Sequence, residues 1–470
     1  MCGIIGLTHA VQSAHDVYRG LLMLQHRGQD SAGILSYDAA TGMFHSKKQL
    51  GKVADVFSAT DLDRLKGAMA LGHTRYSTIG DVKESDLQPM AGVMPIGIGL
   101  VHNGNLSNYA ALKASLLAKG RAFLSDNDLE VILHLMSGAF ASSPSAPLEE
   151  RLIEAARAVM QRAEGGYSVI GILPGLGLFG FRDPHGIRPL IIAERDEADG
   201  RKSYAFASED AALGFVGYKR VRDVAPGELV WIPSVGDEAE VLHSRSLVPR
   251  SGLPCMFEWI YFSSADANLE SVPVYETRLR LGQLLASRVG AAIDPSTIDV
   301  VSAVPETSRI SAIALAETLA RPYREVLIKN RYVQRSFILN GQDKRQVAVG
   351  MKFSVVDSVI AGKTVLLVDD SIVRGTTSRK LVQLLRQHGA ARVYLASSCP
   401  PIRHPCLYGI DFPDRKDLVA AGRPLDSVAQ ALDADGVFYT TLADLETALG
   451  RPFCAACLTG EYAYGAGAAA

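Results

Sequence analysis

The sequence has little excess charge and few cysteines, and each shortage excludes a class of protein. Among 470 residues, 48 Lys and Arg stand against 50 Asp and Glu, giving a formal net charge of −2. With no basic residues clustered along it, such a chain is not suited to capturing nucleic acid or an anionic membrane by charge. The six cysteines are unevenly spaced, unlike a disulfide framework. Any anionic ligand must therefore be held by local features.

Long uninterrupted hydrophobic runs are also missing. The nearest approach is YSVIGILPGLGLFGF at residues 167–181, which carries no charge. Its glycines and Pro174 interrupt it, and its Val, Ile and Phe content is typical of two buried strands joined by a turn. The start of the chain has neither the basic segment nor the apolar stretch of a secretion signal. We therefore expect a cytoplasmic protein with no membrane partner.

The length and the strand pattern predict two domains, divided near residue 250. A chain of 470 residues exceeds what one hydrophobic core usually serves. Residues 1–250 hold short apolar strands and few helices, which predicts a strand-rich α+β layer structure. Residues 251–470 alternate strands with helices, which predicts βαβ units and a parallel sheet. Strands are expected at 297–304, 364–368 and 392–396, and helices at 106–117, 308–319 and 377–386.

The opening MCGIIGL places a cysteine directly after the initiator methionine, at the head of an apolar strand. Once the methionine is removed, the Cys2 thiol lies beside a free α-amino group, which titrates near 8 and can take the thiol proton. Nucleophile and base would then belong to one residue. The alternative is a cysteine that is simply buried in a strand.

Four further segments, in order, resemble the N-terminal-nucleophile glutamine amidotransferase domain, with its stacked antiparallel sheets and helices. They are LQHRGQDSAG (24–33), GHTRYSTIG (72–80), LVHNGNLSNY (100–109) and SDNDLE (125–130). The resemblance assigns catalytic roles to Cys2, Arg27, Asn103 and Gly104, and glutamine binding to Gly28, Arg75 and Asp128.

The assigned residue types suit glutamine, which is a zwitterion. Arg75 would grip the α-carboxylate and Asp128 the α-ammonium. The Asn103 side chain and the Gly104 N–H would stabilise the oxyanion formed when sulfur attacks the amide. In the sequence, Asn103-Gly104 ends a strand and Arg75 lies just past one. The alternatives are a type I′ hairpin turn for Asn103-Gly104 and solvated surface charges for Arg75 and Asp128.

A second motif, VLLVDDSIVRGTT (365–377), is an apolar strand followed by two acids, a polar loop and a helix. A loop rich in hydroxyls and N–H groups at a helix N-terminus binds anions, and no G-x-x-x-x-G-K-[ST] motif is present. The segment resembles the phosphoribosyl pyrophosphate loop of type I phosphoribosyltransferases. There the acids contact the ribose hydroxyls and the loop holds the 5-phosphate. The alternative is a strand end whose carboxylates face solvent.

The same resemblance extends to substrate and metal contacts. Phosphoribosyl pyrophosphate would be bound by Thr307, Lys329, Arg331, Asp369, Asp370, Ser371, Val373, Arg374, Gly375, Thr376 and Thr377. Mg²⁺ would accompany the pyrophosphate, held mostly by substrate oxygens near Thr307, Asp369 and Asp370. Residues 329–353 resemble the loop that closes over the substrate. Gly350 stands where a basic residue is expected, which weakens the predicted anion contacts of that loop.

Together the two domains resemble the amidophosphoribosyltransferase family. The resemblance implies transfer of the glutamine amide nitrogen to C1 of 5-phosphoribosyl 1-pyrophosphate, the committed step of purine synthesis. It also implies inhibition by purine nucleotides and a homotetramer. The Asp369-Asp370 loop argues against hexosamine-forming and asparagine-forming amidotransferases. A non-catalytic, nucleotide-sensing regulator of the same fold is the remaining alternative.

Four cysteines fall where one subgroup of this family binds a 4Fe–4S cluster. They are Cys255, Cys406, Cys454 and Cys457, and such a cluster requires four thiolates. Zinc accepts the same ligands, so the sequence leaves both metals open. Scattered structural cysteines are the third interpretation. It suits Cys399, which has no counterpart among the ligands.

Overall fold

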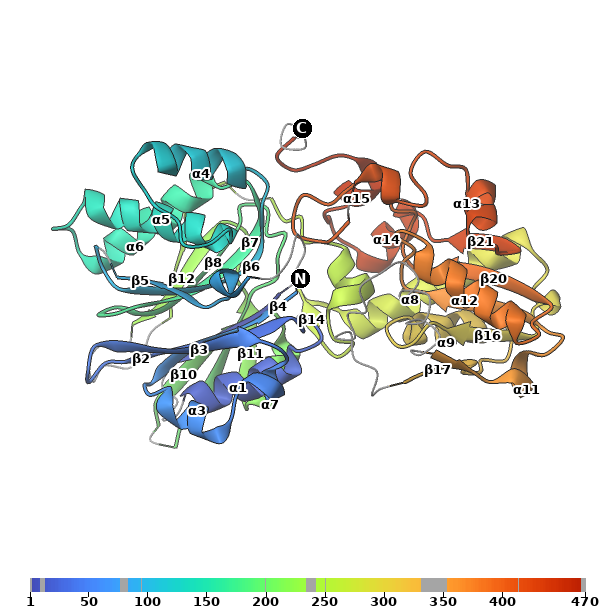
Figure 1. Ribbon diagram of the computed structural model, residues 1–470, viewed down its shortest axis with the longest axis horizontal. Coiled ribbons are helices and arrows are strands. Elements are labelled where there is room, and N and C mark those ends of the chain that lie inside the picture. Colours follow the sequence, from blue (N-terminus) through green and yellow to red (C-terminus); the bar gives the residue numbers. More distant parts are fainter. Residues whose placement is uncertain are drawn as a thin grey trace.

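Two antiparallel sheets are stacked face to face in the first half of the chain (Figure 1). This computed structural model describes residues 2–8, 13–76, 83–93, 95–198, 200–233, 242–249, 251–330, 353–412 and 414–465. The seven-stranded sheet has the order β11-β9-β10-β1-β4-β2-β3, and the six-stranded sheet the order β13-β12-β8-β7-β6-β5. Apolar side chains from both sheets, such as Ile4, Leu71 and Ile170, form the core between them.

The strands of these sheets are short, and helices cover their outer faces. The seven-stranded sheet comprises β1 (Gly3–Thr8), β2 (Ser31–Asp38), β3 (Met43–Leu50), β4 (Met69–Arg75), β9 (Ile191–Asp196), β10 (Lys202–Ala207) and β11 (Lys219–Asp223). The six-stranded sheet comprises β5 (Met90–Gly92), β6 (Ile98–Leu106), β7 (Gly165–Leu173), β8 (Gly177–Arg182), β12 (Glu228–Pro233) and β13 (His243–Ser246). On one side lie α1 (Ser13–Met23), α2 (Val53–Val56), α3 (Ala59–Arg64) and α7 (Asp210–Phe215), and on the other α4 (Tyr109–Ala118), α5 (Asp128–Ser142) and α6 (Leu148–Arg162).

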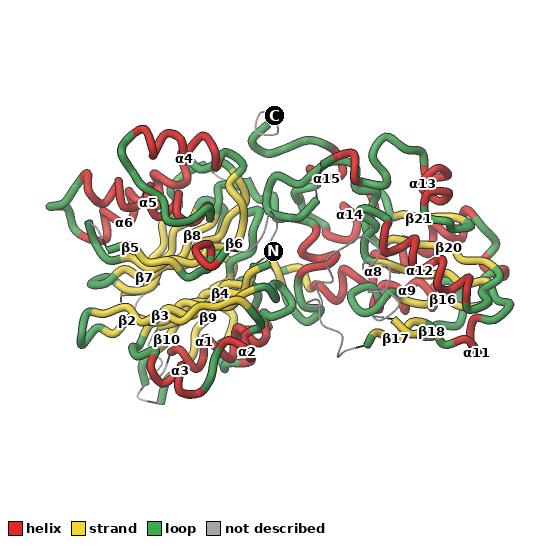
Figure 2. Tube along the Cα trace, in the orientation of Figure 1, coloured by secondary structure: helices red, strands yellow, loops and turns green. Residues whose placement is uncertain are grey.

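The second half contains a four-stranded parallel sheet of order β16-β19-β20-β21 (Figure 2). Its strands are β16 (Val300–Ala303), β19 (Thr364–Asp369), β20 (Arg392–Ser397) and β21 (Gly436–Tyr439). The larger helices here are α8 (Val274–Ala292), α9 (Arg309–Thr318), α12 (Thr376–Gln387), α13 (Leu425–Ala431) and α14 (Leu442–Leu449), and the shorter ones are α11 (Asp357–Ile360), α15 (Ala456–Thr459) and a π-helical turn at Glu258–Phe262. Small hairpins pair β14 (Asn268–Leu269) with β15 (Val272–Pro273) and β17 (Leu327–Lys329) with β18 (Phe353–Val355).

Strand β19 shows why this sheet is buried on both faces. Val365 and Leu367 belong to the core shared with α12, whereas Leu366 and Val368 belong to the core shared with α8 and α9. Alternate residues of a strand point to opposite faces, so a continuous apolar run lets helices pack on both sides. This confirms the predicted α+β and α/β fold classes. The division near residue 250 remains a prediction.

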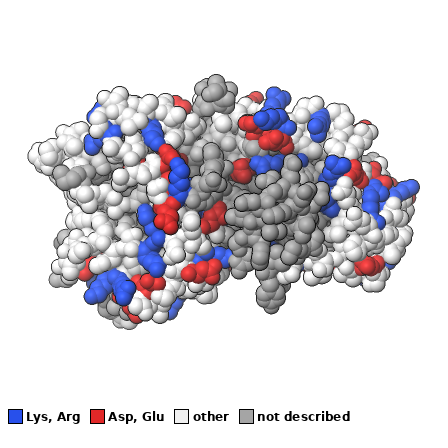
Figure 3. Space-filling view, viewed as in Figure 1, with Lys and Arg blue, Asp and Glu red and all other residues white. Residues whose placement is uncertain are grey.

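The predicted elements were correct in kind and shifted at their ends. The uncharged stretch at 167–181 is two buried antiparallel strands, β7 and β8, joined by a turn as expected. No helix in the described parts of the chain is long and apolar enough to span a membrane. The helix expected from residue 106 begins at Tyr109, because β6 continues through Leu106. On the face shown in Figure 3, positive and negative side chains are intermixed.

Candidate active sites

Cys2 lies at the head of β1, where both stacked sheets contribute to its surroundings. Gly3 is opposite Thr74 in the antiparallel register with β4, which sets Cys2 beside Arg75 at the end of that strand. The Cys2 N–H donates to the Asn103 side-chain oxygen at 3.2 Å, and Asn103 belongs to β6 of the other sheet. The half-buried Cys2 is thus held between the two sheets.

The predicted oxyanion residues lie inside a strand, so the strand end expected there is wrong and the hairpin turn is excluded. Asn103 and Gly104 pair with Ser168 and Tyr167 of β7. Gly104 has a φ of +154°, and a Cβ there would lie 2.0 Å from the Gly166 carbonyl oxygen, so only glycine fits. The buried Asn103 amide nitrogen has no hydrogen-bond partner among the described residues. It is a donor available to a developing negative charge.

The two predicted glutamine-binding charges lie at the ends of elements near Cys2. Arg75 is the last residue of β4 rather than one past it, and it donates to the Asp86 carbonyl. Asp128 is the first residue of α5, as expected, and its carboxylate accepts the Leu106 N–H at 3.0 Å. A Cβ on Gly28 would lie 2.5 Å from the Arg75 carbonyl carbon, so glycine permits this close packing. The segments that resemble the glutamine amidotransferase domain therefore converge near Cys2.

Arg27 is completely buried and holds the backbone of Cys2. Its Nε donates to the Cys2 carbonyl at 3.0 Å, and its guanidinium pairs with Glu209 and, through two 3.0 Å contacts, with Glu258. Burial alone lowers the pKa of Arg27, but the two carboxylates outweigh it and the pKa lies above its ordinary value. Through these contacts Arg27 orients the Cys2 backbone. The catalytic role expected for it stays a prediction.

The second site lies at the carboxyl edge of the parallel sheet, where the predicted phosphate loop joins β19 to α12. A cavity of about 420 Å³ opens there. It is lined by Asp369, Ser371, Val373, Arg374, Gly375, Thr376, Thr377, Ser378 and Asp411. Gly375, just before α12, has a φ of +74°, and a Cβ there would lie 2.5 Å from Leu432. The loop can therefore turn only with glycine at this point.

Asp369 and Asp370 are buried side by side at the base of this loop. Burial and the neighbouring Asp370 raise the pKa of Asp369 well above its ordinary value. Burial also raises the pKa of Asp370 to about 6, although the hydrogen bond from Ser371 and the charge of Arg278 oppose the rise. A site built from two mutually repelling buried carboxylates favours a cationic or hydroxyl-rich ligand.

Of the other predicted substrate contacts, Thr307 and Lys329 are among the described residues. Thr307 comes shortly after β16, Asp369 ends β19 and Asp370 follows it. These strands are parallel neighbours, so all three residues lie at one edge of the sheet. Lys329 ends β17. Arg331 and Gly350 lie outside the described residues.

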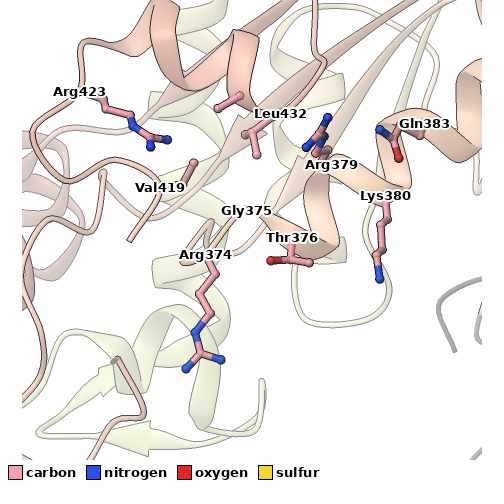
Figure 4. Close-up of a pocket in the computed structure, with 10 residues that line it drawn as sticks. Arg374, Gly375, Thr376, Arg379, Lys380, Gln383, Val419, Arg423 and Leu432 are labelled. Atoms are coloured by element: carbon pink, nitrogen blue, oxygen red, sulfur yellow. The ribbon is translucent and has the colours of Figure 1, made fainter. Parts of the chain in front are cut away.

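A second, larger cavity of about 600 Å³ adjoins the phosphate loop (Figure 4). Its lining includes Arg374, Arg379, Lys380 and Arg423. Arg379 and Arg423 lie on either side of Leu432, whereas Arg374 extends away from them. Arg379 also pairs with Asp433 at 2.8 Å, so part of its charge is already neutralised. The cavity remains rich in positive charge.

The four predicted metal-binding cysteines come together from three parts of the chain. Cys255 and Cys454 form a parallel bridge, with the Cys454 N–H donating to the Pro254 carbonyl at 2.9 Å. Burial raises the pKa of Cys457, and the nearby Cys406, Cys399, Cys255 and Cys454 raise it further. All are free thiols. Within the described ranges, no three His, Cys, Asp or Glu side chains lie at the spacing of a metal site.

Several residues with clear roles in these sites were not predicted from the sequence. Glu209 and Glu258 pair with Arg27, and Asp411 lines the phosphate-loop cavity. Glu258 stands in the apolar stretch MFEWIYF, and an acid in such a run is a signal of a buried partner. Asp411 carries no comparable signal, because its position depends on a long irregular loop.

Comparison with known proteins is consistent with both sites. A family model of the glutamine amidotransferase domain matches residues 73–214, and one of the phosphoribosyl transferase domain matches residues 279–410. The amidophosphoribosyltransferase of Schizosaccharomyces pombe is 43% identical over 486 residues, covering 99% of this chain and 91% of that protein. The chain belongs to the amidophosphoribosyltransferase family.

Other members of the family agree in sequence and in fold. The Escherichia coli amidophosphoribosyltransferase is 41% identical over 449 residues, covering 95% of this chain and 88% of that protein. A solved structure of glutamine phosphoribosylpyrophosphate amidotransferase from B. subtilis, complexed with ADP and GMP, has a TM-score of 0.86 and 35% identity. That match covers 98% of this chain and 97% of the other. Neither comparison tests the iron–sulfur prediction.

The buried acid pair predicts a stability that falls with rising pH in the ligand-free protein. An acid whose pKa is higher in the folded state holds its proton more tightly there, so deprotonation between about pH 4 and 6 disfavours folding. Asp370→Asn should therefore raise the free energy of unfolding at pH 7.5 by roughly 1–3 kcal/mol, with the gain vanishing near pH 4. Chemical denaturation at both pH values measures this.

The matched control is Asp426→Asn, at an exposed aspartate, which should change stability by less than about 0.5 kcal/mol. An Asp370→Asn protein less stable than the parent at pH 7.5 would contradict the view that the buried Asp370 carboxylate destabilises the ligand-free fold.

Proposed function

We propose that this chain transfers the amide nitrogen of glutamine to C1 of 5-phosphoribosyl 1-pyrophosphate, giving 5-phosphoribosylamine, glutamate and pyrophosphate. The reaction is the committed step of purine synthesis. The observation that carries the proposal is the joining, in one chain, of the Cys2 site and the acid-bearing phosphate loop. Neither site alone would account for both half-reactions. A non-catalytic regulator would not need the available Asn103 donor beside Cys2.

The first half-reaction takes place at Cys2. After removal of the methionine, the α-amine accepts the thiol proton and the sulfur attacks the amide carbon of glutamine. The Asn103 amide and the Gly104 N–H stabilise the oxyanion, and its collapse releases ammonia and leaves a thioester. Water then hydrolyses the thioester to glutamate. Arg75 and Asp128 hold the α-carboxylate and α-ammonium throughout.

The second half-reaction takes place at the phosphate loop. Ser371–Thr377 would bind the 5-phosphate through hydroxyl and backbone N–H groups, and Asp369 and Asp370 would accept hydrogen bonds from the ribose. Ammonia attacks C1 as pyrophosphate leaves. Mg²⁺ would neutralise the charge on the pyrophosphate, and the carboxylates and the Thr307 hydroxyl are oxygen donors of the kind it prefers. Lys329 and Arg331 are proposed pyrophosphate contacts.

We propose further that purine nucleotides inhibit the enzyme by binding beside this loop. A nucleotide phosphate suits both the loop and the adjoining cavity lined by Arg374, Lys380 and Arg423. The B. subtilis relative was solved with ADP and GMP. A cytoplasmic homotetramer is the expected state of the protein.

The four cysteines are proposed as ligands of a 4Fe–4S cluster. Two observations support this: backbone hydrogen bonds draw their segments together, and Cys255, Cys406 and Cys454 each raise the pKa of Cys457. Four thiols are the donor type that such a centre requires, with zinc as the alternative metal. A bound cluster would supply a structural clamp, because neither half-reaction transfers electrons. It would fasten the C-terminal segment around α15, which lies near the junction of the two halves (Figure 1).

Replacing the nucleophile should separate the two half-reactions. Cys2→Ala should abolish glutamine-dependent synthesis and leave ammonia-dependent synthesis largely intact at alkaline pH, where ammonia is unprotonated. Pyrophosphate release with each nitrogen donor measures this. The reciprocal variant, Asp370→Asn, should retain basal glutamine hydrolysis and lose synthesis from both donors. If Cys2→Ala removes both activities in a folded protein, its assigned role is wrong.

Metal analysis should identify the metal that the four cysteines bind. Anaerobically purified protein should be brown and contain about four irons per chain, as this cluster type requires. Cys457→Ser should lose the colour and the iron, whereas Cys399→Ser should keep both. Stoichiometric zinc in colourless protein would replace the cluster assignment. Metal-free, fully active protein with titratable thiols at these positions would refute a metal centre.

A further inference from the structure

Arg75 and Asn127, the residue that precedes Asp128, share a single backbone oxygen. The Asp86 carbonyl accepts a hydrogen bond from Arg75, and it also accepts one from the Asn127 amide nitrogen at 2.7 Å. Asn127 directly precedes Asp128 and caps α5, its side-chain oxygen accepting the Leu129 N–H at 3.0 Å. One carbonyl thus sets the position of Arg75 and of the helix end that carries Asp128.

Gln88 joins this arrangement to the strand that carries the oxyanion donors. Its side-chain oxygen accepts the His102 N–H at 2.7 Å, and its amide nitrogen donates to the Asn127 oxygen at 3.4 Å. Gln88 is only 4% exposed, so neither bond can be replaced by solvent. His102 immediately precedes Asn103. Gln88 therefore lies between the oxyanion strand and the start of α5.

The His102 ring supports the carboxylate of Asp128 from the same strand. Its Nδ1 lies 3.5 Å from one oxygen of Asp128, whose other oxygen accepts the Leu106 N–H at 3.0 Å. Burial lowers the pKa of His102 although the charges of Asp128 and Cys2 oppose this, and His73 and Arg188 lower it further. Both oxygens of Asp128 are thus oriented by β6.

We propose that Gln88 and Asn127 are positioning residues that fix the separation of Arg75 and Asp128, and so make the site select an α-amino acid. The inference rests on the proposed glutaminase function. The carboxylate and ammonium of glutamine are attached to the same carbon, so a cation and an anion can grip both only at one spacing. A small displacement of either group loses one contact, and misplacement is costly in an oriented site.

The test compares glutamine with glutaramate, which has the same amide and carboxylate but no α-amino group. Gln88→Met removes both hydrogen bonds at similar volume. It should lower kcat/KM for glutamine by about tenfold or more, the scale of one charge-assisted contact, and change the value for glutaramate by less than about twofold. The ratio of kcat/KM for glutamine to kcat/KM for glutaramate should therefore fall. Gln49→Met, at an exposed glutamine on β3, is the matched control and should change neither value.

Ammonia-dependent synthesis reports whether each variant is folded. If Gln88→Met does not fold, Asn127→Asp gives the same test, because it keeps the capping oxygen and removes the donor to Asp86. Equal losses with both substrates, or an unchanged preference, would overturn the inference. Parent enzyme without any glutamine hydrolysis would instead overturn the proposed function.

Discussion

A buried guanidinium connects the nucleophile to the second half of the chain. Arg27 donates to the Cys2 carbonyl and pairs with Glu209, just after β10, and with Glu258, in the π-helical turn that precedes α8. All of these side chains are nearly or fully buried. An unpaired charge there would cost several kcal/mol, so each of the three segments is stabilised by contact with the other two. The backbone position of Cys2 thus depends on a residue more than two hundred positions away.

A second connection runs along the loop that follows Cys406. The Leu407 carbonyl accepts from the Asn105 side chain at 2.9 Å, and a Cβ on Gly409 would lie 3.1 Å from the Gly104 carbonyl carbon. Farther along, Asp411 approaches Arg374 of the phosphate loop at 3.8 Å. One short loop therefore contacts the oxyanion strand at one end and the phosphate loop at the other. Cys406, the predicted cluster ligand, directly precedes this loop.

The structural elements around the sites that were predicted correctly are those with local physical signals. The apolar run, paired acids and glycine-bearing turn of β19 and α12 lie within a short stretch, and so does the capped start of α5 at Asp128. Asn103-Gly104 has the composition of a hairpin turn, but a glycine with positive φ let β6 continue through it. Asparagine followed by glycine does favour a turn, but pairing with β7 keeps both residues within strand β6.

The parts that were missed depend on residues distant in sequence. The pairing of Arg27 with Glu258, and the sharing of the Asp86 carbonyl by Arg75 and Asn127, are set by packing of the whole fold. Neither leaves a periodic or compositional pattern in one segment. Assignments of Mg²⁺, the cluster and Arg331 remain predictions, the last because it lies outside the described residues.

The most direct measurement of whether the two sites work as one enzyme is the transfer of labelled nitrogen. Amide-¹⁵N glutamine should be supplied with phosphoribosyl pyrophosphate, Mg²⁺ and excess unlabelled ammonium, near neutral pH. The label should appear in 5-phosphoribosylamine, with glutamate and pyrophosphate released in equal amounts. Glutamate released without pyrophosphate, and no ¹⁵N in the sugar product, would contradict the account.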